Sequence, residues 1–170
     1  MQVSERNSWL LYRALKATGI RVVSALPESW LVPVIRIIGE DPEMKLVQLA
    51  KEEEGVGISA GAHFAGLKAA MIIPNHGLLA AVNPIVSLAQ LYKVPMLIVV
   101  AYRGTFGDPY PWHTPGGTVT EPLLRMLRVP YMSRDSPDAL DRRVRDAQTL
   151  VEASLLPVVL LLRHELMMED

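Results

Sequence analysis

The sequence predicts an α/β protein with a doubly wound, mostly parallel sheet of six strands and helices on both faces. Three observations predict this class. Short apolar segments alternate along the whole chain with longer segments of helical periodicity. Residues 94–101 are apolar throughout, as expected for a strand that is covered on both faces. The length of 170 residues suits a single domain, 1–170, with a substantial core.

Local signals place the helices. Ser4 can cap a helix over residues 5–18, which Gly19 ends. Ser136 and Pro137 begin another, since serine suits the cap and proline the first helical position. It extends to about residue 153. The other helices are expected over about 30–38, over the stretch 51–62 with the glutamates in its first turn, over about 75–92 and over about 119–127.

The strands are expected between these helices. Buried apolar runs occupy residues 20–26, 44–49, 69–73, 94–101, about 130–132 and 157–162, and the tail after them is charged. In such a sheet, ligands bind outside the carboxyl ends of the strands. The turns at those ends are Pro27-Glu28-Ser29, Lys51-Glu52-Glu53, Pro74-Asn75-His76-Gly77 and Tyr102-Arg103-Gly104. Polar residues therefore gather along one edge of the sheet.

Composition excludes several classes of function. There is no cysteine, which excludes disulfides, thiolate metal sites and a cysteine nucleophile. The net charge of −1 provides no basic surface for nucleic acid. No apolar run reaches the roughly 18 residues that cross a membrane, and the N-terminus has no signal-peptide pattern. We expect a soluble, cytoplasmic protein that binds neither nucleic acid nor membrane.

The stretch Lys51-Glu52-Glu53-Glu54 leads directly into a helix of small residues, with Gly57 and Gly61 four positions apart. Each glycine costs a helix about 1 kcal/mol relative to alanine, so the pair suggests close approach by another backbone or a flat ligand. Glutamates at a helix N-terminus also complement the helix dipole, which is the simpler interpretation of the acidic turn.

Common catalytic motifs are missing. No G-x-G-x-x-G follows the first strand, and the chain has neither a P-loop nor a G-x-S-x-G elbow. The four histidines have no metal-ligand spacing, and His164 is expected to be an ordinary tail residue. The residues alone therefore predict a site without naming its chemistry.

Several segments, in order, resemble the pyrimidine-binding domain of thiamine-diphosphate-dependent decarboxylases, in particular the small alpha subunit of sulfopyruvate decarboxylase and the matching half of phosphonopyruvate decarboxylase. The first turn, the acidic stretch, the Asn75 turn, the fourth strand and the segment after it all carry the resemblance. These segments are Leu26-Pro27-Glu28-Ser29, Lys51 to Ala62, Asn75-His76-Gly77-Leu78, Tyr92 to Leu97, Arg103-Gly104 and His113 to Thr120.

The resemblance implies roles for these residues. Glu52 corresponds to the glutamate that hydrogen-bonds N1′ of the aminopyrimidine and thereby activates the cofactor. The cofactor-binding residues are then Glu52, Pro27, Asn75 and Gly77, and the candidate substrate-binding residues are Glu28, Ser29, His76, Arg103 and His113. The implied reaction is the non-oxidative loss of CO2 from a sulfopyruvate-like 2-oxo acid. Glu53 and Glu54 are expected to be cap or surface residues.

The chain departs from the family at two places. The family turn Q-N-S-G-L-G-N is Pro74-Asn75-His76-Gly77-Leu78-Leu79-Ala80 here, and Glu28 replaces an aspartate. These two changes leave open a different substrate, such as a bulkier or aromatic 2-oxo acid. The family's G-D-G segment, which holds Mg²⁺ and the diphosphate, is also absent, and Gly107-Asp108-Pro109 does not match it. We expect a beta subunit to supply both, in a hetero-oligomer with two or more copies of each chain.

Three alternatives stay open at this level. The chain could be a non-catalytic regulatory or scaffold subunit with the altered 75–80 turn as a trace of lost activity. It could belong to a thiamine-dependent carboligase. It could also be a doubly wound domain that binds an unrelated ligand at its strand ends.

Overall fold

The computed structural model describes residues 2–133 and 139–169. Its main sheet has six strands in the order β3-β2-β4-β5-β7-β6, and every neighbouring pair is parallel. The predicted fold class and the six predicted strands are confirmed. The strands are β2 Ile20–Ala25, β3 Lys45–Gln48, β4 Lys68–Pro74, β5 Met96–Ala101, β6 Tyr131–Ser133 and β7 Pro157–Leu162.

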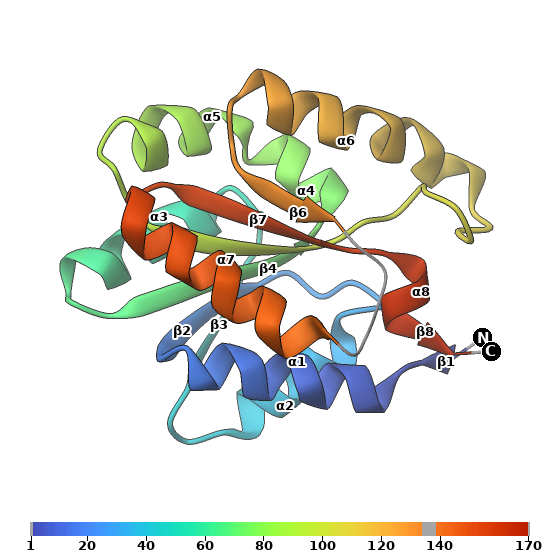
Figure 1. Ribbon diagram of the computed structural model, residues 1–170, viewed down its shortest axis with the longest axis horizontal. Coiled ribbons are helices and arrows are strands. Elements are labelled where there is room, and N and C mark those ends of the chain that lie inside the picture. The colour runs from blue at the N-terminus through green and yellow to red at the C-terminus, as the bar shows by residue number, and fades with distance from the viewer. Residues whose placement is uncertain (1, 134–138, 170) are drawn as a thin grey trace.

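Helices cover both faces of this sheet, with α4, α5 and α6 above the strands and α1 and α2 below them in Figure 1. Each helix layer encloses its own hydrophobic core against the sheet. One layer contains α1 Glu5–Ala17, α2 Val32–Glu40 and α7 Leu140–Ser154. The other contains α3 Glu54–Phe64, α4 Asn75–Ala80, α5 Val82–Pro84, the π-helix η1 Ile85–Gln90 and α6 Thr114–Met126.

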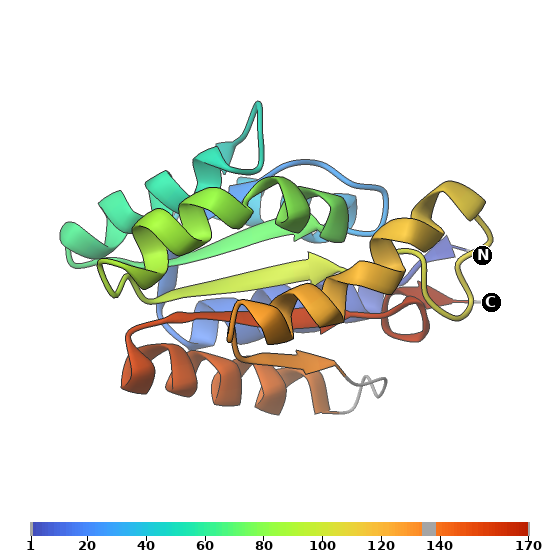
Figure 2. The same ribbon diagram turned by 90° about the horizontal axis from the view of Figure 1, so that it is seen from above.

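Strand β5 shows why a central strand is apolar at every position. All six of its residues are 0% exposed, and their side chains alternate between the two cores. Leu97 and Val99 pack into the core under α1 and α7, whereas Ile98 and Val100 pack into the core under α3 and α4. Figure 2 looks onto the face of the sheet and shows this strand, in yellow-green, near its middle.

Two predicted helices differ in extent. The expected helix over 75–92 is divided into α4, α5 and η1, and Pro84, which has no N–H to donate, lies at the junction of α5 and η1. Helix α6 begins at Thr114 rather than near residue 119, with a proline in its first turn. His113 therefore belongs to the short 3-10 helix η2 Pro111–His113 instead of an irregular loop. The predicted start at Ser136 and Pro137 lies outside the described residues.

The charged tail forms structure that was not predicted. It contains α8 His164–Met167 and β8 Met168–Glu169, and β8 pairs antiparallel with β1 Gln2–Val3. Ser4 caps α1 as predicted, because its Oγ accepts a hydrogen bond of 3.1 Å from the Asn7 N–H. Figure 1 shows both termini on the side to which the main strands point.

A residue in the left-handed conformation follows the helical segments before β2, β4, β5, β6 and β7, whereas α2, which leads into β3, ends at the cap residue Asp41 with φ −84°. Glycine takes this position before β2 and β4, at Gly19 and Gly66. Non-glycine residues take it before β5, β6 and β7, at Lys93, Arg128 and Leu155, with φ between 52° and 55°. In the part of the chain that the structure describes, no helix is long and apolar enough to cross a membrane.

Candidate functional site

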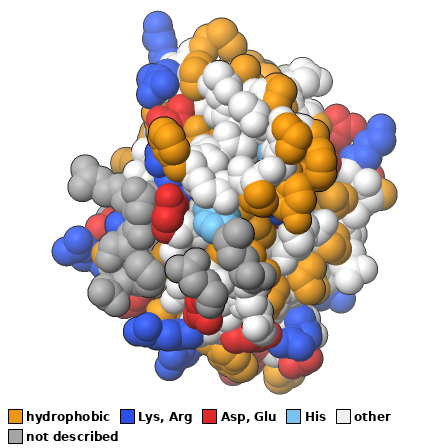
Figure 3. Space-filling model, turned by 90° about the vertical axis from the view of Figure 1, so that its right-hand side faces the viewer, with side chains coloured by type: hydrophobic (Ala, Val, Ile, Leu, Met, Phe, Trp, Pro, Cys, Tyr) orange, Lys and Arg blue, Asp and Glu red, His pale blue; other side chains and the backbone are white. Residues whose placement is uncertain are grey.

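The carboxyl ends of β2, β3, β4 and β5 bring the four predicted turns to one edge of the sheet. Because the strands are parallel and adjacent in the order β3-β2-β4-β5, residues far apart in the sequence become neighbours there. Figure 3 looks onto this side of the molecule, where hydrophobic side chains gather over one half of the view and a histidine lies near the middle.

The three consecutive glutamates have different environments. Glu54 lies in the first turn of α3, and its carboxylate accepts hydrogen bonds from the Ala50 and Lys51 N–H groups at 3.0 and 3.2 Å. Glu53 is exposed and lies 4.0 Å from the Lys51 ammonium group. Glu52 is partly buried, and its carboxylate makes no hydrogen bond or ion pair with any residue that the structure describes.

The position of helix α3 corrects one expectation. The helix begins at Glu54, so Glu52 and Glu53 precede it instead of forming its first turn. Only Glu54 lies in the first turn of α3, where a carboxylate complements the helix dipole. Glu52 lies outside α3, so interaction with the helix dipole does not account for its carboxylate.

Gly77, in α4, leaves the space that the Glu52 side chain occupies. A Cβ atom at Gly77 would lie 2.3 Å from Glu52 Cγ and 2.6 Å from its Oε1, which no real side chain tolerates. The glycine is therefore required by the close approach of the carboxylate. The two residues that the sequence assigned to cofactor binding on separate turns are in direct contact.

Two of the three glycines of α3, Gly57 and Gly61, face outward, whereas Gly55 is buried against Met71 and Ser24. A Cβ atom at Gly57 or Gly61 would meet nothing within 4 Å in this chain. The helix therefore presents bare backbone at two successive turns, next to the end that carries Glu52. Close approach by another backbone or a flat ring is possible on this face without rearrangement of the chain.

Arg103, expected to bind substrate, is instead buried between two carboxylates. It is 4% exposed, its Nη1 contacts Glu28 Oε1, and its Nε lies 3.0 Å from Asp108 Oδ2. Its guanidinium also stacks over the Trp30 ring, 4.2 Å from the centroid. Ser29 Oγ lies 3.0 Å from Nη1 and completes the group. The charges of Arg103 and Glu28 thus compensate each other inside the protein.

Asp108 was not predicted as a site residue, yet it has the most hydrogen bonds in this cluster. Its side chain is 0% exposed. Oδ2 accepts hydrogen bonds from Gly104 N at 2.9 Å and from Arg103 Nε at 3.0 Å, and it lies 2.9 Å from His113 Nδ1. Oδ1 accepts one from Tyr110 N at 3.2 Å. Burial opposes ionisation, but these donors outweigh it and hold the pKa of Asp108 well below its ordinary value.

His76 and His113 meet at this edge, with ring centroids 5.5 Å apart. His76 is exposed and rests on helix α6, since a Cβ at Gly116 would lie 2.8 Å from its Nε2. Partial desolvation of its ring against the protein, and then the nearby charges of His113 and Arg103, lower the pKa of His76 below its ordinary 6.5. His76 is therefore uncharged at neutral pH.

Asn75 is fully buried, and its side chain is engaged within the protein. Its Nδ2 donates to the Arg103 carbonyl at 3.0 Å and to Thr120 Oγ1 at 3.1 Å, while its Oδ1 accepts from the Arg103 N–H at 3.3 Å. These hydrogen bonds occupy the side-chain amide, and the assignment of Asn75 to cofactor binding stays a prediction. Asn75 joins the end of β4 to β5 and α6. Pro27 is exposed at the end of β2.

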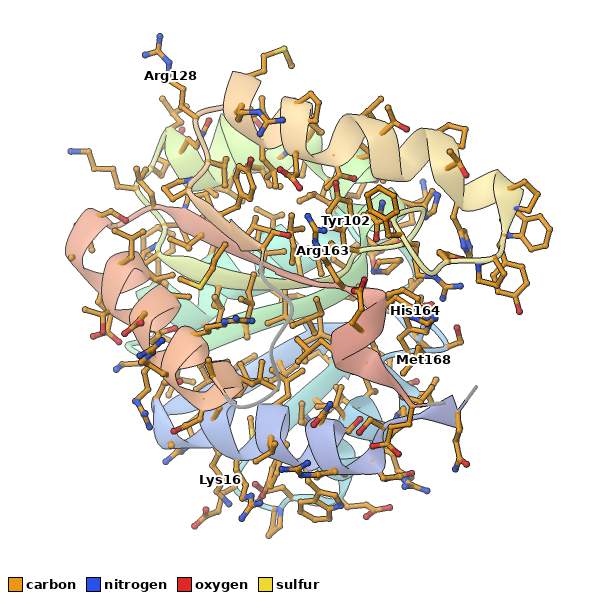
Figure 4. All side chains as sticks on the ribbon, turned by 45° about the vertical axis from the view of Figure 1, so that its right-hand side comes forward. Lys16, Tyr102, Arg128, Arg163, His164 and Met168 are labelled. Carbon is orange, nitrogen blue, oxygen red and sulfur yellow. The ribbon has the colours of Figure 1, made fainter. Side chains whose placement is uncertain are left out.

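A second polar cluster lies along α6 and β7. Tyr102 and Arg163 are neighbours there (Figure 4), with the guanidinium carbon 5.7 Å from the Tyr102 ring centroid. Glu121 lies 3.3 Å from Arg163 Nη2 and on the wall of an adjoining cavity of about 640 Å³. Burial, followed by the Glu121 charge, raises the pKa of Tyr102 to about 12. Tyr102 therefore keeps its proton at neutral pH.

The side chains at the site suit the pyrimidine side of thiamine pyrophosphate. An unpaired carboxylate beside bare helix backbone provides a hydrogen-bonding partner for a ring nitrogen and room for a flat ring. Among residues 2–133 and 139–169, no group of three or more His, Asp or Glu residues could hold a metal ion.

Comparison with known proteins agrees with a thiamine pyrophosphate site. The family described as thiamine pyrophosphate enzyme, N-terminal TPP binding domain matches residues 7–109. The chain is 32% identical to sulfopyruvate decarboxylase subunit alpha of Methanococcus maripaludis, over 89% of this chain and 91% of that protein. It is 36% identical to the subunit of the same name from Methanothermobacter thermautotrophicus, over 77% of this chain and 79% of that one.

Two longer proteins match over a part of their length. Phosphonopyruvate decarboxylase of Streptomyces viridochromogenes is 29% identical over 76% of this chain, which corresponds to 33% of that protein. A solved 2-oxoglutarate:ferredoxin oxidoreductase from Magnetococcus marinus superposes with a TM-score of 0.72 over 94% of this chain and 29% of its own, at 21% identity. That structure supports the fold alone. From the family match and the two alpha subunits, we conclude that this chain belongs to the thiamine pyrophosphate enzymes, as an N-terminal TPP-binding domain.

Proposed function

We propose that this chain is the alpha subunit of a split thiamine-diphosphate-dependent decarboxylase, which converts a sulfopyruvate-like 2-oxo acid to an aldehyde and CO2. The observation that carries the proposal is the Glu52 carboxylate, unpaired within the described chain and held against Gly77 at the carboxyl edge of the sheet. The match over 91% of an alpha subunit of sulfopyruvate decarboxylase supports the reaction class.

Glu52 is assigned the role of hydrogen-bonding N1′ of the cofactor's aminopyrimidine. The bound cofactor supplies the nucleophilic carbon and the electron sink that 2-oxo acid decarboxylation requires. Glu52 holds the proton that it shares with N1′, and this role needs a carboxyl group without a competing partner. Glu53 and Glu54 do not meet that requirement, because Glu53 is exposed to solvent and Glu54 accepts hydrogen bonds from the Ala50 and Lys51 N–H groups.

The two histidines are assigned to the substrate. His76, uncharged and exposed, can donate or accept a hydrogen bond next to Gly77. His113 lies against it and is assigned to proton transfer. Glu28, Ser29 and Arg103 bind one another, so we assign them to the wall of the site and not to direct contact with a substrate anion.

The remaining half of the site is assigned to a beta subunit, which would bind Mg²⁺ and the diphosphate. The outward-facing backbone at Gly57 and Gly61 supports docking of such a subunit on α3. We propose a hetero-oligomer with at least two copies of each chain, located in the cytoplasm.

Glu52→Gln tests the proposal. In the complex with the partner, the amide keeps the size of the side chain but cannot hold the shared proton, so kcat for sulfopyruvate decarboxylation should fall at least about 100-fold. Aldehyde and CO2 should be measured together, with and without a second aldehyde, because CO2 release with a 2-hydroxy ketone in place of free aldehyde would indicate a carboligase.

Glu53→Gln is the matched control, since it removes the neighbouring carboxylate from an exposed position. It should keep kcat within about twofold, as expected for a surface substitution. If the Glu52→Gln complex kept the same near-wild-type kcat as the Glu53→Gln complex, Glu52 would have no catalytic role. That result would favour a scaffold subunit.

A further inference from the structure

The position of the proton on the His113 ring follows from the groups around Asp108. His113 Nδ1 lies 2.9 Å from Asp108 Oδ2, and the side chain of His113 is 16% exposed. A hydrogen bond between an imidazole nitrogen and a carboxyl group needs one proton, which can come from either partner. The surroundings of the carboxyl group decide between them.

Asp108 can only accept. Its Oδ2 already accepts hydrogen bonds from Gly104 N and Arg103 Nε, and its Oδ1 accepts one from Tyr110 N. These donors and the Arg103 charge keep the group ionised, with its pKa well below the ordinary value. The proton between the two side chains is therefore on His113 Nδ1.

This arrangement leaves Nε2 as the ring nitrogen through which His113 exchanges protons. No described residue forms a hydrogen bond with Nε2. The ring is held on its other sides by edge contacts with Tyr110 and Trp112, at centroid distances of 5.5 and 5.8 Å, and by His76. Its orientation is therefore limited by both packing and the Asp108 hydrogen bond.

We infer that Asp108 is a positioning residue for the decarboxylation: it fixes His113 in the Nδ1–H form and directs Nε2 to the substrate as proton donor. The inference rests on the proposed function. In the overall reaction, the bond between the carbonyl carbon and the carboxylate breaks, and its electron pair ends in the C–H bond of the aldehyde. One proton is consumed, which His113 Nε2 donates and then regains from solvent.

The carboxylate of Asp108 has a second effect on the same ring. While Nε2 is protonated, the imidazolium is positively charged and lies beside the charge of Arg103. The Asp108 carboxylate compensates the imidazolium charge at hydrogen-bond distance, as the carboxylate of a catalytic triad does for its histidine. Glu28 neutralises Arg103 from the opposite side, without any hydrogen bond to His113.

The test combines ¹⁵N NMR of the histidine ring with kinetics of the complex. In the wild-type protein at a pH where the ring is neutral, the protonated nitrogen of His113 should be Nδ1. In Asp108→Ala it should become Nε2, the form that free histidine prefers. In the complex, kcat should fall between about 10- and 100-fold, with KM changed less than about threefold, because orientation is lost and substrate contacts are not.

Asp108→Asn covers the case in which the alanine variant does not fold. The amide oxygen can keep the hydrogen bond to Nδ1 but carries no charge, so the Nδ1–H form should persist while kcat falls at least about 10-fold. Glu28→Gln is the matched control for the NMR measurement, since it removes the other carboxylate bound to Arg103. It should leave the His113 tautomer unchanged.

The outcomes are separable. A folded Asp108→Ala protein that keeps the Nδ1–H form, a kcat within twofold of wild type in either Asp108 variant, or a tautomer change in Glu28→Gln would each overturn the inference. A wild-type complex that decarboxylates no 2-oxo acid would refute the proposed function instead, and the NMR result would still decide whether Asp108 sets the tautomer.

Discussion

Missing side chains shape the site as much as present ones. Gly77 makes room for Glu52, and Gly116 makes room for His76. Gly104, with φ +75°, and Gly117 allow the chain after β5 to press its backbone against the start of α6. At three of these positions the atoms next to the absent Cβ are backbone or a proposed catalytic group, so alanine cannot be accommodated without movement.

Gly77→Ala should displace Glu52. The new Cβ would overlap Glu52 Cγ, so the carboxylate has to turn away from the position that we assign to the pyrimidine ring. Decarboxylation by the complex should fall at least about 10-fold, and the free energy of unfolding should drop by about 1–3 kcal/mol. Steady-state kinetics and urea denaturation measure the two effects.

The corresponding change at Gly57 is the stability control. A Cβ there meets nothing within 4 Å, so Gly57→Ala should stabilise the isolated chain by up to about 1 kcal/mol through helix propensity. If Gly77→Ala keeps wild-type kcat, the contact between Gly77 and Glu52 has no role in catalysis.

Among the residues of the candidate site, the sequence predicted some and missed others, and the reason is physical. Glu52 and Gly77 could be found because a recognisable pattern surrounds each. Asp108 could not, because a single aspartate in a loop rich in glycine, proline and aromatic residues has no diagnostic spacing. Its role depends on burial and on donors from Arg103 and Tyr110 that only the folded loop brings to it. Burial likewise engages the side chain of Asn75 with Arg103 and Thr120, which no sequence pattern indicates.

At the scale of helices and strands, the turns into β5, β6 and β7 contain a correctable strain. Each of these turns has a non-glycine residue in the left-handed conformation, which costs an L-residue about 1–2 kcal/mol. Arg128 offers the simplest case. It is exposed, and Figure 4 shows it pointing away from the rest of the molecule.

Arg128→Gly should raise the stability of the chain. Glycine removes the left-handed strain, and part of that gain is offset by its greater flexibility in the unfolded state, for a net of about 0.5–1 kcal/mol. Thermal unfolding should shift upward by about 2–4 °C for each kcal/mol. Arg128→Ala keeps the strain and should show no such rise. A lower melting temperature for the glycine variant than for the alanine variant would contradict the argument.

Element boundaries were harder to predict than element types. The apolar pattern after β4 is continuous, but Pro84 and the π-helical turns of η1 interrupt the expected single helix. The beginning of α6 was placed too late because its first turn contains Thr114, Pro115 and two glycines, which read as a loop. Periodicity detects which face of a helix is buried, and it is weak where the residues are small.

For the molecule as a whole, the alternation of strands and helices was enough to predict the parallel sheet and the edge at which the site lies. What the sequence did not reveal is the two-stranded ribbon of β1 and β8, whose strands have only two residues each and no periodicity to detect. The predicted division of the site between two chains leads to a test of the assembly.

The isolated chain should decarboxylate no 2-oxo acid, and addition of the beta subunit should restore turnover in proportion to complex formed. Removal of Mg²⁺ with EDTA should abolish thiamine diphosphate binding by the complex. The same treatment should leave the melting temperature of this chain alone unchanged, because the residues described contain no metal-binding group. Light scattering measures complex formation. Calorimetry measures thiamine diphosphate binding and the melting temperature. Full-rate turnover by the chain alone would refute the split site.

The amide of Asn75 has a consequence for how the two chains meet. By bonding to the backbone of Arg103 and the hydroxyl of Thr120, it makes the end of β4, the end of β5 and α6 a single body. Asp108 does the same for the loop from Gly104 to Tyr110. The conformational entropy of this wall is therefore lost during folding and not when the cofactor or the partner arrives. Association then begins from a surface that already has its final shape, so the on-rate should reflect diffusion and orientation instead of slow loop ordering.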